Sequence, residues 1–361
     1  MHMADALISP AVGGVLWGAT AVIVATSARK VRNELDESKI PLMGVAGAFV
    51  FAAQMLNFAI PGTGSSGHLG GALILAILLG PEAAFLVIAS VLAVQALFFA
   101  DGGLLALGCN IFNLGFFPAF IVYPLIYRGI VGRGPELRTG RVVAGSLLAG
   151  IVGLQLGAFA VVLETTASGI SALPFTTFVL LMQPVHLAIG VVEGLVTAGV
   201  VLFVYKAQPE LLARSAARRP LRGLRLKPVL IGLGVAALVA GAGLSWFAST
   251  RPDGLVWSIA KVTGSEQKLQ ANDSAHALAA GLQARTAILP GYGRRQADAA
   301  DVGAAGGRAS GGTSQVDADV SLSGAVGALI VVGLVTGVGF VLYRRSAGRR
   351  AGLLDVTQRT E

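Results

Sequence analysis

The sequence predicts an all-α integral membrane protein: a seven-helix bundle followed by a two-helix C-terminal hairpin with a long external loop. Of its 361 residues, 54% are hydrophobic and only 13% are charged, about half the roughly 25% charged fraction of an ordinary soluble domain. The mean hydropathy is +0.74. The charged residues are clustered, and they leave apolar runs such as 10–28 and 228–248, which approach the ~20 residues that cross a bilayer.

The same composition excludes whole classes of protein. So little charge cannot cover a soluble globule of this size, which excludes soluble enzymes, disordered scaffolds and DNA-binding domains. The net charge of +8 lies mainly in loops between apolar segments, so we expect a lipid membrane and no nucleic acid as partner. The single cysteine, Cys109, excludes a disulfide framework and a multi-thiolate metal site, and we expect it to be a small packing residue.

Nine hydrophobic segments follow one another along the chain. They lie at residues 9–28, 41–60, 69–80, 82–100, 104–127, 142–165, 175–205, 229–248 and 324–343. The region 69–100 allows two interpretations, one long helix or two short ones. Pro81 has no backbone donor and keeps Gly80 out of the helical region, which favours a break between the two.

The charge distribution decides between these interpretations. With two helices and an external N-terminus, 20 of the 27 Lys and Arg residues lie in cytoplasmic segments, and the other seven lie in one long external loop. A single helix would place the Arg-rich loops outside, against the positive-inside rule, from which long loops are exempt. The cytoplasmic segments are then 29–40, 128–141, 206–228 and 344–361. We expect a multi-pass protein of a bacterial or archaeal cell membrane with a cytoplasmic C-terminus.

The chain divides into a seven-span unit, a basic linker and a two-span part. We expect these at residues 1–205, 206–228 and 229–343, with an external loop at 249–323 and a cytoplasmic tail at 344–361. Within the loop, 297–320 is rich in Ala, Gly, Ser and Asp and is expected to be disordered, whereas 275–289 is expected to form a short helix. Residues 1–8 contain no Lys or Arg, so we expect no signal peptide and a mature chain that begins at or near residue 1.

The N-terminus is a candidate metal site. A free α-amine at Met1, the amide nitrogen of His2 and the His2 imidazole can chelate one ion through two fused rings, and we expect Met1 to be retained before the bulky His2. Planar nitrogen coordination of this kind suits Ni²⁺ and Cu²⁺. His68 is a natural fourth donor, because it follows a Gly- and Ser-rich loop on the same predicted side of the membrane. The alternative is that His2 belongs to a frayed terminus and His68 is an ordinary polar loop residue.

Three runs of residues resemble the CbiM/NikM family, the substrate-specific membrane components of energy-coupling-factor ABC importers for cobalt and nickel. These runs are Met1–Leu7, the sequence IPGTGSSGHLGG at 60–71, and GGLLALGCNIFN at 102–113. The run QPVHLAIGVVEGLVT at 183–197 also resembles the last core helix of that family. Separately, RPDGLVWS at 251–258 resembles the PDGLEWS signature of the CbiN/NikN accessory subunit, with Val256 in place of the usual Glu.

The resemblance implies a natural fusion of these two components. It implies that Met1, His2 and His68 hold Ni²⁺ or Co²⁺ as the transported substrate, with no bound cofactor. It also implies that a transmembrane T-component and ATPase subunits of the CbiQ/NikQ and CbiO/NikO kinds supply the energy. The chain itself is then a transport subunit and not an enzyme, and it contains no G-x-x-x-x-G-K-[ST] nucleotide-binding motif.

Other polar residues near the expected outer surface are candidates for orienting the metal-binding imidazoles. They are Asn57, Ser65, Ser66, Gln95, Asp101, Asn110 and Asn113. For the asparagines and Gln95 the alternative is an ordinary interhelical hydrogen bond, and for Asp101 we favour a cap on the following Gly102–Gly103. His186 and Glu193 lie nearly on one helix face and form either a relay or a structural pair with other helices. His276 lies in the external loop and is expected to be incidental.

Two functions remain open at this stage. The first is capture and import of Ni²⁺ or Co²⁺, driven by partner ATPases. The second is a proton-coupled secondary carrier for transition metals, against which stand the few buried carboxylates and the absence of internal repeats. A membrane-embedded metalloenzyme lacks a paired acid and base near His68. The sequence does not choose between nickel and cobalt.

Overall fold

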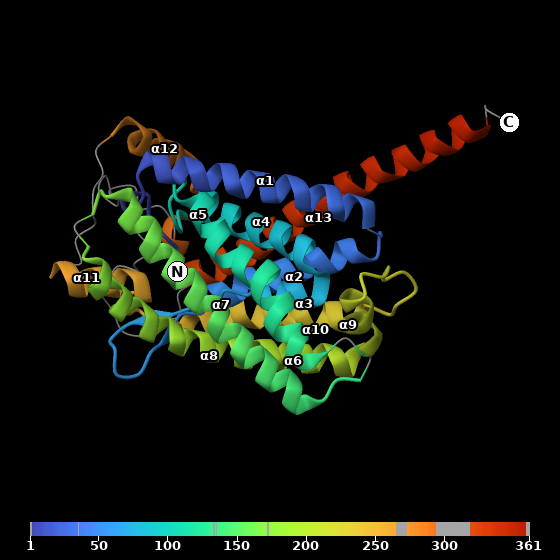
Figure 1. Ribbon diagram of the computed structural model, residues 1–361, viewed down its shortest axis with the longest axis horizontal. Helices are drawn as coiled ribbons and strands as arrows, with labels where there is room; N and C mark the ends of the chain where they lie inside the picture. Colours follow the sequence, from blue (N-terminus) through green and yellow to red (C-terminus); the bar gives the residue numbers. More distant parts are fainter. Residues whose placement is uncertain are drawn as a thin grey trace.

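A computed structural model describes residues 2–34, 36–132, 134, 136–171, 173–264, 273–293 and 318–358. Seven of its helical stretches are long and apolar enough to cross a membrane. They are Pro10–Glu34, Pro81–Phe99, Leu107–Val131, Thr139–Ser168, Phe175–Ala207, Lys227–Phe247 and Asp319–Arg345. The helices pack side by side in one bundle, and only the C-terminal end of α13 extends away from it (Figure 1). This confirms the all-α membrane fold.

The elements follow one another in this order. The N-terminal half contains η1 (Asp5–Leu7), α1 (Pro10–Glu34), α2 (Lys39–Gln54), β1 (Phe58–Ala59), β2 (Ser66–Gly67), α3 (Ala72–Leu79), α4 (Pro81–Phe99), α5 (Leu107–Ile111), η2 (Phe112–Tyr127) and α6 (Arg128–Val131). The rest contains α7 (Thr139–Ser168), α8 (Phe175–Ala207), α9 (Pro209–Ala216), α10 (Lys227–Leu238), η3 (Val239–Gly243), η4 (Leu244–Phe247), α11 (Gly254–Thr263), α12 (Ser274–Thr286), η5 (Pro290–Tyr292) and α13 (Ala318–Gln358).

The expected break between α3 and α4 is present. Gly80 ends α3 with φ 82° and ψ 160°, a conformation that favours glycine, and Pro81 begins α4. The helices are shorter than the hydrophobic segments 41–60 and 69–80, because α2 has 16 residues and α3 has 8. Eight helical residues cover about 12 Å of a ~30 Å hydrocarbon core. All eight side chains of α3 are buried inside the bundle, so this short helix is covered by its neighbours.

The helices run back and forth between two ends of the bundle. At one end, called the site end, residues 2–9, 55–71 and 100–106 lie close to the chain after η4: Met3 O accepts from Gly103 N at 2.9 Å, and Asn57 O accepts from Ser249 N at 2.7 Å. At the other end, called the linker end, Leu221 N donates to Asp36 Oδ2 at 2.6 Å. Figure 1 shows α11 and α12 at the site end and α9 at the opposite, linker end.

Helices α7 and α8 pack with their backbones in close contact. A Cβ added at Gly150 would lie 2.7 Å from Gly194 N, and one added at Gly190 would lie 2.7 Å from Ile151 Cα. These glycines have no side chain, and so the two longest helices of the first 207 residues can meet closely, as small residues allow in membranes.

The C-terminal hairpin packs on α2. A Cβ at Gly44 would meet the Thr336 hydroxyl at 2.6 Å, and one at Gly47 would lie 3.2 Å from Val331. Helix α13 continues to Gln358, beyond the segment 324–343 expected from hydropathy, because the following residues include good helix formers such as Ala, Arg and Leu. The helix expected at 275–289 is present as α12, whereas the stretch expected to be disordered falls outside the described residues up to 317.

Candidate metal site

The two histidines nominated from the sequence meet at the site end. The imidazole rings of His2 and His68 stack with centroids 4.9 Å apart and planes 7° from parallel. Both are buried: the His2 side chain is 6% exposed and His68 is 8% exposed. Met1, the third expected ligand, lies outside the described residues. Among the described residues, no group of three or more His, Cys, Asp and Glu side chains could hold a metal ion.

Hydrogen bonds define which ring nitrogens carry protons. His68 Nδ1 lies 3.0 Å from Leu69 O, and because a carbonyl only accepts, Nδ1 donates and Nε2 carries the lone pair. Burial lowers the pKa of His68 well below its ordinary value, which keeps the ring neutral. His2 Nδ1 lies 3.2 Å from Asp101 Oδ1, and His2 Nε2 is buried without a hydrogen-bond partner in the described structure.

Asn110 holds the N-terminal segment in place. Its Oδ1 accepts from Met3 N at 2.8 Å, and its Nδ2 donates to Met3 O at 3.2 Å. Gly103 N also donates to Met3 O, and the Asp5 carboxylate accepts from Ala106 N at 2.9 Å. Asn110 therefore fixes Met3, the residue next to His2, through its backbone, and its recorded bonds do not go to an imidazole.

Asp101 does not cap the glycines that follow it, which corrects the favoured interpretation. Its carboxylate faces His2 Nδ1 through Oδ1, and Oδ2 accepts from the Tyr292 hydroxyl at 2.6 Å. Burial acts to raise the pKa of Asp101, but His2 and the Tyr292 hydroxyl hold it below its usual range. The turn places this carboxylate inward because Ala100 and Gly102 adopt positive φ values of 52° and 82°.

The other nominated polar residues make different contacts. Gln95 accepts the Asp101 N–H on its backbone carbonyl at 3.1 Å, and Asn57 accepts from Ser249 in the same way. The Ser65 hydroxyl pairs with that of Thr63 at 2.7 Å. The Ser66 hydroxyl donates to Arg251 O at 2.8 Å. These four residues therefore shape the loops around the histidines, and their recorded hydrogen bonds go to other groups.

Two buried carboxylates belong to the helices beneath the site. Glu193 accepts from Gly70 N at 2.8 Å and from Gly71 N at 2.9 Å, so it anchors the chain just after His68. His186 donates to Met182 O on its own helix. No bond between His186 and Glu193 is recorded among the described residues, so the relay considered from the sequence is not seen. Glu193 instead fits the structural alternative, because it bonds the backbone of another segment. Glu164 accepts from Asn113 at 2.8 Å, so Asn113 makes the interhelical bond considered for it.

The PDGLVWS run docks beside the His68 loop. Asp253 caps α11 by accepting from Val256 N at 2.8 Å, and Ser66 N donates to Pro252 O at 2.8 Å. A Cβ at Gly254 would lie 2.5 Å from Val185 Cγ1 of α8, so only glycine permits this approach. Trp257 packs on the small apolar cluster at the same place. The C-terminal part thus contacts the loop that carries His68.

The segment between η4 and α13 also covers the N-terminal segment, a contact that the sequence did not predict. Gln283 Nε2 donates to Ala96 O at 2.9 Å and to Gly102 O at 2.7 Å. His276 is only 5% exposed, so the expectation that it is incidental was wrong. It lies 2.9 Å from Asp5 O and 3.0 Å from Ile8 O. No local pattern reveals contacts between residues more than 180 positions apart.

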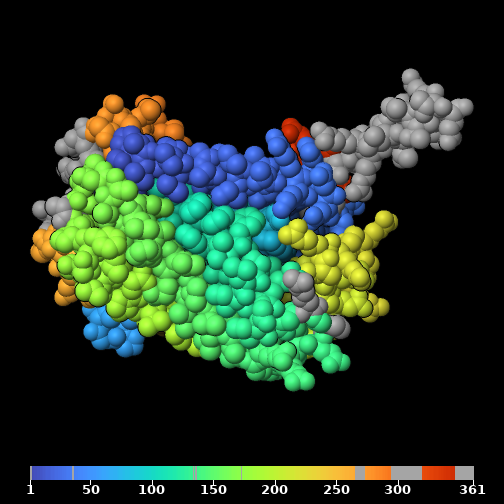
Figure 2. All heavy atoms as spheres, viewed as in Figure 1, coloured from blue at the N-terminus to red at the C-terminus, as the bar shows by residue number. Residues whose placement is uncertain are grey.

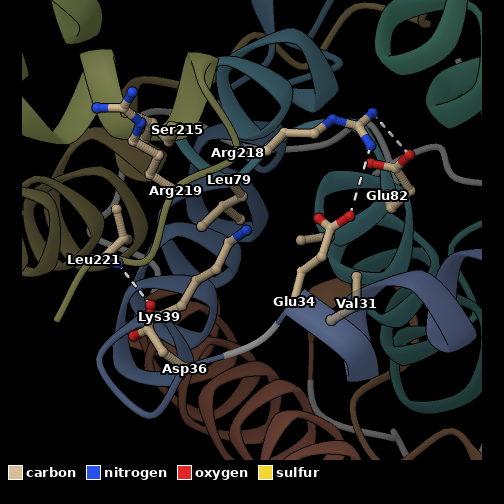
Figure 3. Close-up of a pocket in the computed structure, with 13 residues that line it drawn as sticks. Val31, Glu34, Asp36, Lys39, Leu79, Glu82, Ser215, Arg218, Arg219 and Leu221 are labelled. Atoms are coloured by element: carbon tan, nitrogen blue, oxygen red, sulfur yellow. Dashed lines mark hydrogen bonds and ion pairs between the residues drawn. The ribbon is translucent and has the colours of Figure 1, made fainter.

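A second polar cluster lies at the linker end, around a surface pocket of about 520 Å³ that includes open solvent. Glu82 pairs with Lys30 at 3.1 Å and with Arg218 at 3.0 Å, and Arg218 also approaches Glu34 at 3.8 Å. Figure 3 shows Arg218 extending from the linker to the two carboxylates, with Lys39 to their left. These residues tie the linker to α1 and α4, far from the histidines.

Comparisons with known proteins match both parts of the chain. The family described as cobalt uptake substrate-specific transmembrane region matches residues 2–211, and the PDGLE domain matches residues 227–344. A putative metal transport protein of Haloquadratum walsbyi is 37% identical over 59% of this chain and 93% of its own length. The fused nickel transport protein NikMN of Rhodobacter capsulatus is 34% identical over 68% of this chain and 72% of its own.

A solved structure supports the same relationship. A crystal structure described as a transition metal transporter matches with a TM-score of 0.52 and 31% identity, covering 62% of this chain and 100% of its own. The fold and these similarities define a multi-pass membrane component of transition-metal transport, not an enzyme. The chain belongs to the cobalt uptake substrate-specific transmembrane family, and a PDGLE-domain part is fused to it.

Proposed function

We propose that this chain is the substrate-binding membrane component of an energy-coupling-factor ABC importer that takes up Ni²⁺, Co²⁺ or both by chelation at its N-terminus. One observation carries the proposal: the His2 and His68 imidazoles stack 4.9 Å apart, both buried, at the point where the chain begins. Related proteins are named for cobalt and for nickel transport.

The donor set explains why such a site needs the terminus itself. The α-amine of Met1, the amide nitrogen and Nδ1 of His2 form two fused chelate rings, and Nε2 of His68 supplies the fourth nitrogen. Four nitrogens in a plane suit Ni²⁺, whose binding displaces the amide proton. In the metal-free chain the Asp101 carboxylate faces Nδ1 of His2, the nitrogen that binds the metal in this proposal, so metal binding has to replace that contact.

Partner subunits complete the importer in this proposal. A T-component and two ATPase subunits bind the chain, and the ATPases supply the energy by hydrolysing ATP. The chain itself lacks the G-x-x-x-x-G-K-[ST] nucleotide-binding loop. The proton-coupled carrier is the competing function. It predicts that a protonophore stops uptake while inactivation of the ATPases does not; the importer predicts that loss of ATP hydrolysis stops uptake.

The orientation in the membrane is part of the proposal. The site end faces outside and the linker end faces the cytoplasm, in agreement with the 20 of 27 basic residues assigned to the cytoplasmic side. Arg219 lies exposed in the linker, so Arg219→Cys in a Cys109→Ser background is expected to react only from the cytoplasmic face. Labelling from outside would invert the proposed topology.

The direct test is uptake of ⁶³Ni and ⁵⁷Co, supplied separately, in cells that express the complete importer. We expect His2→Ala to abolish uptake of the preferred ion. The matched control is His186→Gln, a change at a buried histidine outside the proposed donor set, which we expect to retain uptake. Normal uptake by His2→Ala would contradict chelation at the N-terminus.

A further inference from the structure

Helix α12 of the external loop rests on the segment that carries the proposed chelate. Figure 2 shows the atoms of α12, in orange, against the beginning of the chain and of α1, in dark blue. The contact centres on His276, whose side chain is 6% exposed. Its Nε2 lies 2.9 Å from Asp5 O and 3.0 Å from Ile8 O, and its Nδ1 lies 2.7 Å from Asp273 Oδ2.

Every partner of the His276 ring is an acceptor. The two carbonyls accept only, and the Asp273 carboxylate accepts only when it is ionised. A neutral imidazole has one N–H, so one ring nitrogen would then turn its lone pair toward an oxygen. An imidazolium has two N–H groups and satisfies both sides. The geometry around His276 therefore matches the protonated ring.

The charged groups around His276 agree with this assignment. Asp273 faces it from the same helix, and the Asp5 carboxylate faces it from η1. Helix α4, also packed on α12, has one titratable residue, Glu82, at its opposite end, and α12 itself has Arg285 nine positions further on. Burial acts to lower the pKa of His276, but the Asp273 carboxylate and the two carbonyls raise it above its ordinary 6.5.

We propose that His276 is a positioning residue: its protonated ring clasps the backbone of Asp5 and Ile8 and so holds the N-terminal chelating segment closed over the metal site. Loss of that proton opens the clasp. Asp273 and His276 thus make metal exchange depend on external pH, separately from protonation of the ligands themselves. This inference rests on the proposed function, because it assigns a gate to the same site.

The sign of the effect follows from the direction of the shift. A group whose pKa is raised in the closed state favours closure at low pH, and this contribution is lost as pH rises through the raised pKa. Between the ordinary value of 6.5 and the raised value, the open fraction grows by up to about tenfold for each pH unit. Metal ligands act in the opposite sense, since they bind better once deprotonated.

Hydrogen–deuterium exchange of the metal-free full-length chain in nanodiscs tests the clasp without metal. After correction for intrinsic exchange, we expect residues 3–8 to open more as pH rises in the wild type and to lose this dependence in His276→Gln. Asp273→Asn is the matched variant, because Asn still caps α12 and its amide can donate to Nδ1 of a neutral ring. Because the neutral ring is then bonded on both sides, opening of residues 3–8 in this variant is expected to depend on pH less than in the wild type. An unchanged pH profile in His276→Gln would overturn the proposal.

A second measurement separates this inference from the proposed function. Ni²⁺ release to a chelator at fixed pH is expected to be faster in His276→Gln than in the wild type, and His2→Ala is expected not to bind Ni²⁺ but to keep the pH-dependent exchange of residues 3–8. If His2→Ala binds Ni²⁺ normally, the proposed function fails while the clasp stands. If release of Ni²⁺ is equal in His276→Gln and the wild type, the clasp does not gate the metal and the inference fails.

Discussion

The two ends of the bundle use polar groups in different ways. At the site end, buried imidazoles and backbone groups contact one another, and His2 Nε2 has no hydrogen-bond partner among the described residues. At the linker end, Glu82 is paired twice with cations, and its partners are exposed: Lys30 is 60% and Arg218 is 45% exposed. An exposed ion pair contributes little to stability, whereas a buried polar atom without a partner is costly.

This difference indicates what each end is for. In the proposed function, the two buried and stacked imidazoles of the site end hold the transported ion. At the linker end, the pairs of Glu82 with Lys30 and Arg218 attach the basic linker to α1 and α4. Changes at the site end are therefore expected to affect metal binding strongly, and changes at the linker end weakly.

The largest effect is expected from one additional residue before Met1. The extension moves the α-amine out of the five-membered chelate ring, so a donor is lost without any change in side chains. We expect Ni²⁺ affinity to fall by about 100-fold or more, beyond the ~10–100-fold typical of changes outside the ligand set. Isothermal titration of the purified chain measures this, with the untagged protein as control. High-affinity binding by a chain that keeps the extension would refute the chelate.

The next largest effect is expected from His68→Ala. His68 is buried against the His2 ring, so His68→Ala loses a nitrogen donor and also leaves a gap at the site end. We expect at least a ~10-fold to 100-fold loss of affinity, with a lower melting temperature but a folded protein. Unchanged Ni²⁺ affinity in a folded His68→Ala protein would show that the fourth donor is another residue.

A smaller effect is expected from Gly254→Val at the contact between the two parts of the chain. The added side chain would clash with Val185 and push α11 away from the His68 loop. Overpacking of this kind costs about 1–3 kcal/mol. We expect limited proteolysis to cut the region around α11 faster, and Ni²⁺ affinity to fall less than in His68→Ala. Equal protease resistance in both proteins would show that the PDGLVWS run does not depend on this close approach.

The smallest effect is expected from Glu82→Gln at the linker end. It removes the charge that pairs with Lys30 and Arg218, which is worth about 0–1 kcal/mol for partly exposed pairs. The melting temperature is expected to fall slightly and Ni²⁺ affinity to stay the same. A loss of metal binding in Glu82→Gln would contradict the separation of the two ends.

The sequence predicted what depends on local pattern. Hydropathy and charge placement gave the membrane fold, the Gly80–Pro81 break and the helix at α12. The pairing of His2 with His68 followed from chemistry and topology, since both residues were assigned to one side of the membrane. The lengths of α2 and α3 were not predictable, because burial by neighbouring helices allows a helix to be shorter than a membrane span.

The parts that were missed depend on contacts between distant segments. His276 lies 271 positions from Asp5, and Tyr292 lies 191 positions from Asp101. Nothing in the residues near His276 indicates that its ring reaches the N-terminus. Asp101 was interpreted as a cap for the same reason, because its partners, His2 and Tyr292, lie far from it in the sequence.

Nickel K-edge X-ray absorption of the Ni²⁺-loaded, untagged chain tests the central claim most directly. The account predicts square-planar coordination by nitrogen donors, seen as the 1s→4p shoulder typical of a planar site. In His2→Ala we expect one of two results. Either the shoulder disappears at the same nickel content, or the protein no longer binds nickel. A six-coordinate, oxygen-rich spectrum that is the same in wild type and His2→Ala would contradict a metal site built on the N-terminus.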